Sequence, residues 1–179
     1  MTINGAEVTF SHLSPMVRKV AIELRHSKKL VDVSFEFSCH CYTRELLEGE
    51  VVPIAHRLQD GSVHKPRFRV FDEQRFELSK DLVEHIDALI KNNEIVTQSR
   101  KENFFRIERV EAAENGATTT IQYFIFMHAR IVQEPSRPKS IKVFVESAYP
   151  EKKGIPHPGG RASRTFGRML GEQWEAQKG

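Results

Sequence analysis

Strict two-residue alternation over residues 30–42 constrains this chain more than any other feature of its sequence. The apolar positions of that run are Val31, Val33, Phe35, Phe37, Cys39 and Cys41, and polar residues separate them. Because successive side chains of a strand point to opposite faces, the pattern predicts a half-buried β-strand. Residues 19–25 alternate in the same way, and the polar stretch 26–29 suits a turn. The chain is therefore expected to open with a β-hairpin.

One helix is predicted in the middle of the chain. Leu82, Val83, Ile86, Leu89 and Ile90 recur at helical spacing and form one apolar stripe. Ser79 is the expected N-cap of this helix, and Asn92-Asn93 is the expected end. Before it, residues 43–67 contain turn residues and few periodic apolar positions, which predicts a long loop, and residues 67–76 suit a short extended segment.

A run of strands follows the helix. Strand-like patterns cover residues 103–110, 118–132 and 141–149, with a shorter extended piece at 94–98. Asn115-Gly116 is a strong hairpin signal between the first two. The fold class expected from this order is α+β, in which an antiparallel sheet made of the opening hairpin and a C-terminal meander carries one main helix on one face.

The C-terminal part has a different composition. Residues 151–163 are rich in Pro and Gly and predict a linker, which divides the chain into a domain at 1–150 and a tail at 151–179. Within the tail, Phe166, Met169, Leu170 and Trp174 have helical spacing behind a candidate cap at Ser163, although Gly167 and Gly171 weaken an isolated helix. An amphipathic helix of this kind must dock on its own body or on a partner.

Charge is distributed unevenly along the chain. The net charge is +3, but residues 136–179 alone contribute +5 and the preceding part contributes −2. A basic end favours an anionic partner such as nucleic acid, while a solvated tail explains it equally well. The sequence shows neither a basic leader nor a long apolar run, which predicts a cytoplasmic protein without a membrane partner.

The first candidate site is the polar face of the strand at residues 30–42. On a continuous strand Glu36, Ser38, His40 and Tyr42 project together, and Arg44 follows. An imidazole, a carboxylate, a phenol and a guanidinium are the groups needed to cleave RNA without a metal, because they supply a base, an acid and a cation for the phosphate. A polar strand face exposed to solvent has the same composition.

The neighbouring cysteines also have two interpretations. Cys39-His40-Cys41 contains good zinc ligands, but strand alternation places His40 opposite the two sulfurs. We therefore expect Cys39 and Cys41 to be reduced, buried thiols, with no bound metal and no cofactor.

The second candidate site lies on the strand at residues 118–132. Gln122, Phe124, Phe126, His128 and Arg130 share one face, and the other face is apolar throughout. Aromatic and cationic side chains together suit a surface that stacks and binds nucleic acid, although the two phenylalanines could equally pack under another element. Further candidate phosphate contacts are Arg100, Lys101, Arg106, Arg161, Arg164 and Arg168.

A helix at 79–92 followed by strands that end in Ser147-Ala148-Tyr149-Pro150 resembles the barnase/EndoU/colicin/RelE-like RNase toxins. The resemblance covers residues 79–150 and implies an endoribonuclease that needs no metal, with His40, Arg106, His128 and Tyr149 as the positions to test. Such toxins are commonly compact, whereas this chain has a long first third and a basic tail. The segments FSCHCYTRE and RVFDEQRFELS also look like bacterial proteins labelled stationary-phase growth adaptation proteins.

These observations leave functions of different classes open. The first hypothesis is a nucleic-acid-directed protein, most concretely an endoribonuclease of toxin-like type. The second is a noncatalytic binding or regulatory module that docks a partner protein or nucleic acid through its basic tail and residues 163–176. A zinc-supported structural domain is the third.

Overall fold

The computed structural model describes residues 2–3, 6–62, 65–98, 103–112, 118–136, 138–150, 160 and 162–176. These residues form a mixed α+β fold in which antiparallel strand pairs predominate, as the sequence predicts. Two sheets carry the architecture, and a two-stranded hairpin of β1 (Thr2–Ile3) and β2 (Ala6–Glu7) precedes them. A short 3₁₀ helix, η1 (Ser11–Leu13), leads from this hairpin into the larger sheet.

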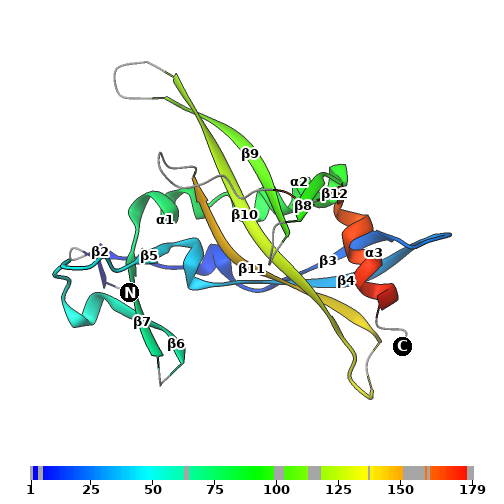
Figure 1. Ribbon diagram of the computed structural model, residues 1–179, viewed down its shortest axis with the longest axis horizontal. Helices are drawn as coiled ribbons and strands as arrows, with labels where there is room; N and C mark the ends of the chain where they lie inside the picture. The colour runs from blue at the N-terminus through cyan, green and yellow to red at the C-terminus, as the bar shows by residue number, and fades with distance from the viewer. Residues whose placement is uncertain are drawn as a thin grey trace.

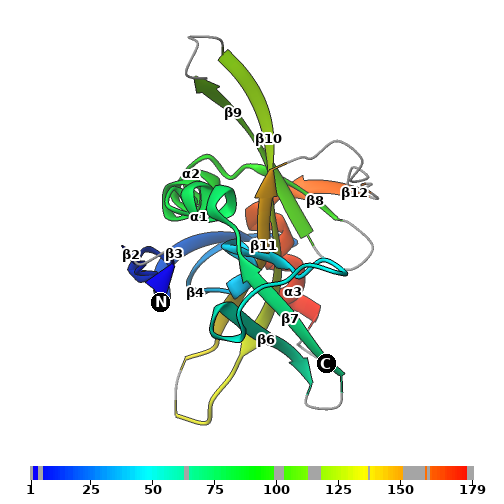
Figure 2. The ribbon, with the colours of Figure 1, turned by 90° about the vertical axis from the view of Figure 1, so that its left-hand side faces the viewer.

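The larger sheet has seven strands in the order β12-β8-β9-β10-β11-β4-β3 (Figure 1). Its strands are β3 (Met16–Glu23), β4 (Lys28–Phe37), β8 (Ile95–Gln98), β9 (Asn103–Ala112), β10 (Thr118–Val132), β11 (Ser140–Pro150) and β12 (Ala162–Thr165). The opening hairpin and the three strands after the helix are therefore confirmed. The predicted Asn115-Gly116 turn lies outside the described residues. At one end β9 and β10 extend beyond the body as a two-stranded ribbon (Figures 1 and 2).

One parallel contact joins the two halves of this sheet. β11 pairs with β4 in parallel, with Ile141 opposite Val33 and Val145 opposite Phe37, whereas the other strand pairs described are antiparallel. The sequence gives no sign of this pairing, because alternation specifies which face a side chain occupies and not which strand lies beside it. The joint places the end of the opening hairpin next to the last strand of the meander.

Three helices contribute to a core on one face of this sheet. α1 (Glu73–Ser79), α2 (Leu82–Asn92) and α3 (Phe166–Ala176) bury apolar side chains in one cluster with the sheet. The helical members of the cluster are Leu78, Leu82, Ile86, Leu89, Phe166, Met169, Leu170 and Trp174. In the described part of the chain, no helix has the length and apolarity needed to cross a membrane.

The helix boundaries differ from the predicted ones at their N-termini. The stripe at 82–90 is helical as predicted and ends before Asn93, which adopts the left-handed conformation with φ of 48°. Ser79, however, is the buried last residue of α1 and not an N-cap. Ser163 lies in β12, and the hydroxyl of Thr165 accepts a hydrogen bond from the backbone N–H of Arg168 instead. Both predicted caps are wrong because a strand or a second helix occupies those positions.

The glycines of α3 explain how this helix docks. A Cβ at Gly171 would lie 1.9 Å from the backbone oxygen of Glu23, and one at Gly167 would lie 2.7 Å from the oxygen of Ala21. Both contacts are closer than any side chain tolerates, so the helix reaches the backbone of β3 only because these positions lack a Cβ. The residues that weaken an isolated helix are those that permit this packing.

The second sheet has three strands in the order β5-β7-β6. Its strands are β5 (Thr43–Glu45), β6 (Arg57–Ser62) and β7 (Lys65–Phe71), and a short 3₁₀ helix, η3 (Ile54–His56), precedes β6. The long loop predicted at 43–67 is therefore wrong. The extended segment predicted at 67–76 is correct up to Phe71, after which the side chain of Asp72 caps α1. Figure 1 shows this sheet at the opposite end of the molecule from α3.

The alternating strand of the opening hairpin ends earlier than predicted. β4 stops at Phe37, and residues Cys39–Cys41 form a 3₁₀ turn, η2. The cause is Ser38, whose hydroxyl accepts a hydrogen bond from the backbone N–H of His40 and so caps the turn. The prediction that Glu36, Ser38, His40 and Tyr42 share one strand face is therefore wrong.

Candidate functional site

The face of the seven-stranded sheet opposite the helices carries rows of mostly polar side chains across the strands. In one row Val17, Ser34, Lys142 and Arg130 are neighbours from β3 to β10, and in the next Glu36, Phe144 and His128 are neighbours from β4 to β10. Two adjoining hollows, of about 570 Å³ and about 240 Å³, lie over these rows. We call this surface the open face.

A β-bulge places a carboxylate beside His128. The pairing of β10 with β11 shifts register between Phe126 and Met127, so that Phe126 lies opposite Ser147 while Met127 lies opposite Val145. Glu146 is the extra residue, and its Oε1 lies 3.0 Å from Nδ1 of His128. Bulges re-aim side chains, and they are frequent beside functional sites. Strand alternation gave no sign of this pair.

His40 has a carboxylate partner of its own. Its Nε2 lies 2.8 Å from Oδ2 of Asp60, which belongs to β6 in the small sheet. The two side chains are 28% and 32% exposed, so the pair is open to solvent on one side. Because η2 replaces the predicted strand here, His40 contacts the small sheet and does not stand beside Glu36.

Ser38 connects the two histidine pairs. Its hydroxyl accepts the N–H of His40 at 2.9 Å and donates to the backbone oxygen of Glu146 at 2.5 Å. The carboxylate of the same Glu146 contacts His128. The histidines do not contact each other in the described structure. His40 contacts Ser38, Ser38 contacts Glu146, and Glu146 contacts His128. A residue of the first candidate site, Ser38, therefore contacts the partner of His128 from the second candidate site, just after the end of β4.

Tyr149 occupies a neighbouring aromatic cluster. Its ring stacks on that of Phe126 at a centroid distance of 5.2 Å, and the guanidinium carbon of Arg75 lies 5.2 Å from its ring centroid. Phe124 and Phe126 are 1% and 5% exposed. Their rings are therefore packed in the protein, and the interpretation of these two residues as a stacking surface for bases is wrong.

Arg75 is the residue of this region that the sequence analysis missed. Its Nη1 donates to the backbone oxygens of His40 at 3.1 Å and Thr43 at 2.9 Å. Burial lowers the pKa of its guanidinium from the ordinary value. Through these bonds Arg75 attaches α1 to the turn that carries His40, while its guanidinium also lies over the ring of Tyr149. A single arginine in a helix has no sequence signal that distinguishes it from a solvated one.

The thiols are protonated in this environment. Cys41 is fully buried, and burial raises its pKa to about 12, while burial also raises the pKa of the half-buried Cys39. Protonated thiols are poor metal ligands. Within the described ranges, no three His, Cys, Asp or Glu side chains are grouped to hold a metal ion.

The cations proposed as phosphate contacts have different surroundings. Arg44 lies in the small sheet, where Nη1 and Nη2 donate to Glu50 at 2.7 and 2.5 Å. Arg164 of β12 and Arg168 of α3 both pair with Glu172 of α3. All three guanidiniums are therefore engaged within the chain, although the single carboxylate of Glu172 balances only one of the two tail arginines.

Two other candidate cations are exposed. Arg130 is exposed on the open face, without a hydrogen bond or ion pair to any other described residue, and Arg106 is exposed on β9 opposite Phe124. Arg100, Lys101 and Arg161 lie outside the described residues.

A family model matches residues 1–172, and its description is the YjaZ family. The chain belongs to this family, because the match spans nearly its whole length. Searches among curated proteins and among solved structures found no match. The family match includes the first 78 residues, which the RNase-toxin resemblance leaves out, and the comparisons give that resemblance no support.

Proposed function

We propose that this member of the YjaZ family is a metal-independent, RNA-directed protein that cleaves RNA at the junction of η2 with the open face. His40 and His128 are the two proton-transfer groups in this proposal. One imidazole removes the proton of the attacking 2′-hydroxyl, and the other protonates the leaving 5′-oxygen. The product of that step is a cyclic phosphate, and no redox change occurs.

The observation that carries the proposal is the linked pair of histidine–carboxylate contacts. A carboxylate in contact with one ring nitrogen holds an imidazole in one orientation, which acid–base catalysis requires of it. Asp60 holds Nε2 of His40, and Glu146 holds Nδ1 of His128. Each ring keeps its other nitrogen without a partner among the described residues. Ser38 hydrogen-bonds to the backbone of His40 and to the backbone of Glu146, one member of each pair.

The open face supports RNA as the substrate class. Arg130, two residues from His128, has no ion pair with any residue that the structure describes, and the ring of Phe144 lies 5.5 Å from the His128 ring. Cationic and aromatic groups on one sheet face are the usual means of binding single-stranded RNA. Lys142 adds less to binding, because its ammonium is 2.5 Å from a carboxylate oxygen of Glu36.

The alternative of a noncatalytic module that docks through its tail has weaker support. The apolar residues of α3 are buried against the chain's own body, and the two described arginines of the tail pair with Glu172. A partner would have to bind a helix whose apolar side is already covered.

The test is cleavage of labelled single-stranded RNA by the purified full chain in EDTA. We expect cleavage by the native protein, with a loss of about 100-fold or more in His128→Gln and in His40→Gln, since removing a general acid or base costs about that much. His26→Gln is the matched control, because His26 is exposed in the β3–β4 turn.

Binding is measured in parallel by fluorescence anisotropy. Arg130→Gln is expected to weaken RNA binding and its salt dependence while cleavage of bound RNA persists. Absence of cleavage by the native protein would refute the nuclease. RNA binding that still depends on Arg130 would then leave a noncatalytic RNA-binding face.

A further inference from the structure

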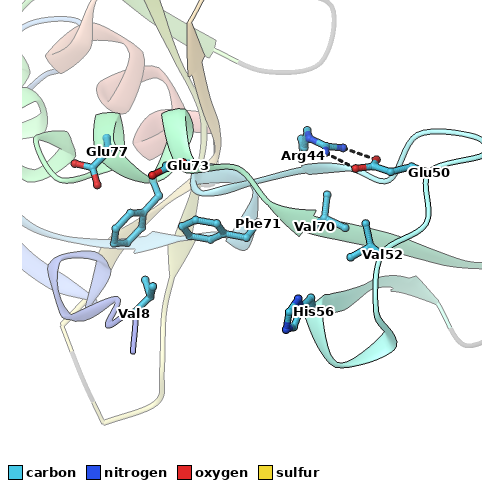
Figure 3. Close-up of a pocket in the computed structure, with 10 residues that line it drawn as sticks. Val8, Arg44, Glu50, Val52, His56, Val70, Phe71, Glu73 and Glu77 are labelled. Atoms are coloured by element: carbon cyan, nitrogen blue, oxygen red, sulfur yellow. Dashed lines mark hydrogen bonds and ion pairs between the residues drawn. The ribbon is translucent and has the colours of Figure 1, made fainter. Parts of the chain in front are cut away.

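A third hollow lies against the small sheet, and neither His40 nor His128 lines it. It is an open pocket of about 510 Å³ between α1, the small sheet and the segment that leads to η3 (Figure 3). Pockets for small organic ligands have volumes of about 300–1,000 Å³. The pocket is therefore large enough for a compact small molecule and is a site apart from the function proposed above.

The floor of this pocket is apolar and partly aromatic. Val8, Val52, Val70, Phe71 and Phe76 line it from the N-terminal segment, the loop before η3, β7 and α1. The two aromatic rings lie 5.3 Å apart at 49°. The ring of Phe76 already accepts a cation, because the ammonium of Lys80 lies 5.0 Å from its centroid. Such a floor suits an apolar ligand body, and its rings favour a cation over an anion.

The one guanidinium of the lining is unavailable to an anionic ligand. Both terminal nitrogens of Arg44 donate to the carboxylate of Glu50, as the dashed lines in Figure 3 mark. The Arg44 hydrogen bonds lower the pKa of Glu50 to about 2, so the carboxylate remains ionised and the pair neutral near pH 7. An anion would have to displace this carboxylate from a bidentate contact.

An uncompensated negative charge lies across the pocket from that pair. Glu77 is paired with Lys80 at 2.6 Å, whereas Glu73 is exposed and makes no hydrogen bond or ion pair with any residue described. Figure 3 shows Glu73 at the α1 side of the pocket, and Phe71 and Phe76 line the same pocket. A carboxylate and aromatic rings in the lining of one pocket suit the recognition of an organic ammonium group.

We infer that this pocket binds an organic amine: a ligand with a protonated amino group and a compact apolar body. The ammonium group contacts Glu73, and the apolar body lies on Phe71, Phe76 and the valines. Charge complementarity selects the amine over a carboxylate of the same shape, and the aromatic floor selects it over a small inorganic cation.

The probes for the test share one body and differ in charge: phenylbutylamine, phenylbutanol and phenylbutyrate. Isothermal titration of the full chain is expected to give the tightest binding for the amine, weaker binding for the alcohol and none for the acid. Glu73→Gln is expected to weaken binding of the amine by about fivefold and to leave the affinity for the alcohol unchanged, because a partly exposed ion pair contributes about that much.

A matched control and a second variant test whether the effect is specific to this pocket. Glu84→Gln removes an exposed carboxylate from α2, outside the pocket, and is expected to bind the amine as the native chain does. Val52→Arg places a cation in the pocket wall and is expected to abolish amine binding. Equal binding of amine and alcohol, or an unchanged amine affinity in Glu73→Gln, would overturn the inference.

Discussion

The two sheets of this protein are held in place by different forces. The seven-stranded sheet buries a continuous apolar face under three helices, including fully buried Phe35, Ile125 and Val143. In the three-stranded sheet Val70 is buried beside two polar residues, Arg69 and Thr43. The first arrangement tolerates small shifts, because apolar contacts have no direction, whereas the second depends on hydrogen-bond geometry.

Thr43 is the centre of the polar attachment. Arg69 donates from Nε to its hydroxyl at 2.8 Å and from Nη2 to its backbone oxygen at 2.9 Å, and Arg75 donates to the same backbone oxygen at 2.9 Å. These bonds hold the small sheet and η2 together. Since Asp60 of the small sheet contacts His40, the His40 half of the candidate site depends on the polar attachment, whereas His128 and Glu146 lie on strands of the main sheet.

The largest expected effect comes from the close contact of α3 with β3. Gly171→Ala should destabilise the whole protein by about 3 kcal/mol, because its Cβ would overlap the backbone oxygen of Glu23. Urea unfolding followed by far-UV circular dichroism measures this. Gln173→Ala, on the exposed side of the same helix, should change stability by less than about 0.5 kcal/mol. Equal stabilities for the two variants would contradict the packing described here.

A smaller and local effect is expected from the polar attachment. Arg69→Met should lower the opening free energy of β5, β6 and β7 by about 2 kcal/mol, since it removes the charged hydrogen bonds to Thr43, while α3 keeps its protection. Native-state hydrogen exchange distinguishes the two regions. Arg67→Met on the same strand is the control, because Arg67 is exposed. Uniform loss of protection in both sheets would show that the small sheet is not a separate unit.

The smallest effect concerns acid and the Arg44–Glu50 pair. The pKa of Glu50 falls from 4.5 to about 2 through its hydrogen bonds with Arg44. A lowered pKa in the folded state stabilises the fold above pH 4.5, and this contribution is lost as the pH falls from 4.5 towards 2. In Glu50→Gln the stability of β5 and β7 should therefore fall less steeply as the pH is lowered than in the native chain. Amide NMR signals of these strands during an acid titration measure this.

The control for the acid titration is Glu48→Gln, because Glu48 is exposed in the same loop. It should keep the acid sensitivity of the native chain. A Glu50→Gln variant that loses its small-sheet signals over the same pH range as the native chain would show that this pair does not hold the small sheet.

The parts of the fold that were predicted correctly are those with a repeating pattern. The alternation in β3, β4 and β10 and the helical stripe of α2 each extend over several residues, so that single exceptions do not obscure them. The small sheet was missed because its strands are short and rich in polar residues. Its side chains are satisfied by contacts distant in sequence, which leave no local periodicity.

The candidate site was predicted only in part. His40 and His128 were singled out for their chemistry, but the strand that was expected to present His40 ends at Phe37, because Ser38 caps a turn. Their partners, Asp60 and Glu146, and the arginine that holds the turn, Arg75, were not recognised. Each lies in an element whose position depends on a register shift or on the packing of one sheet against another.

The sequence by itself determined the strand and helix patterns, the fold class and the face of β10 that turns to the core, because these follow from side-chain periodicity within one segment. Only the tertiary structure decided that β11 lies parallel to β4 and that a bulge turns Glu146 towards His128. It also decided that Gly167 and Gly171 bring α3 against β3. The physical reason is that these features are contacts between distant segments, which depend on the fit of whole surfaces and not on the order of residues in either one.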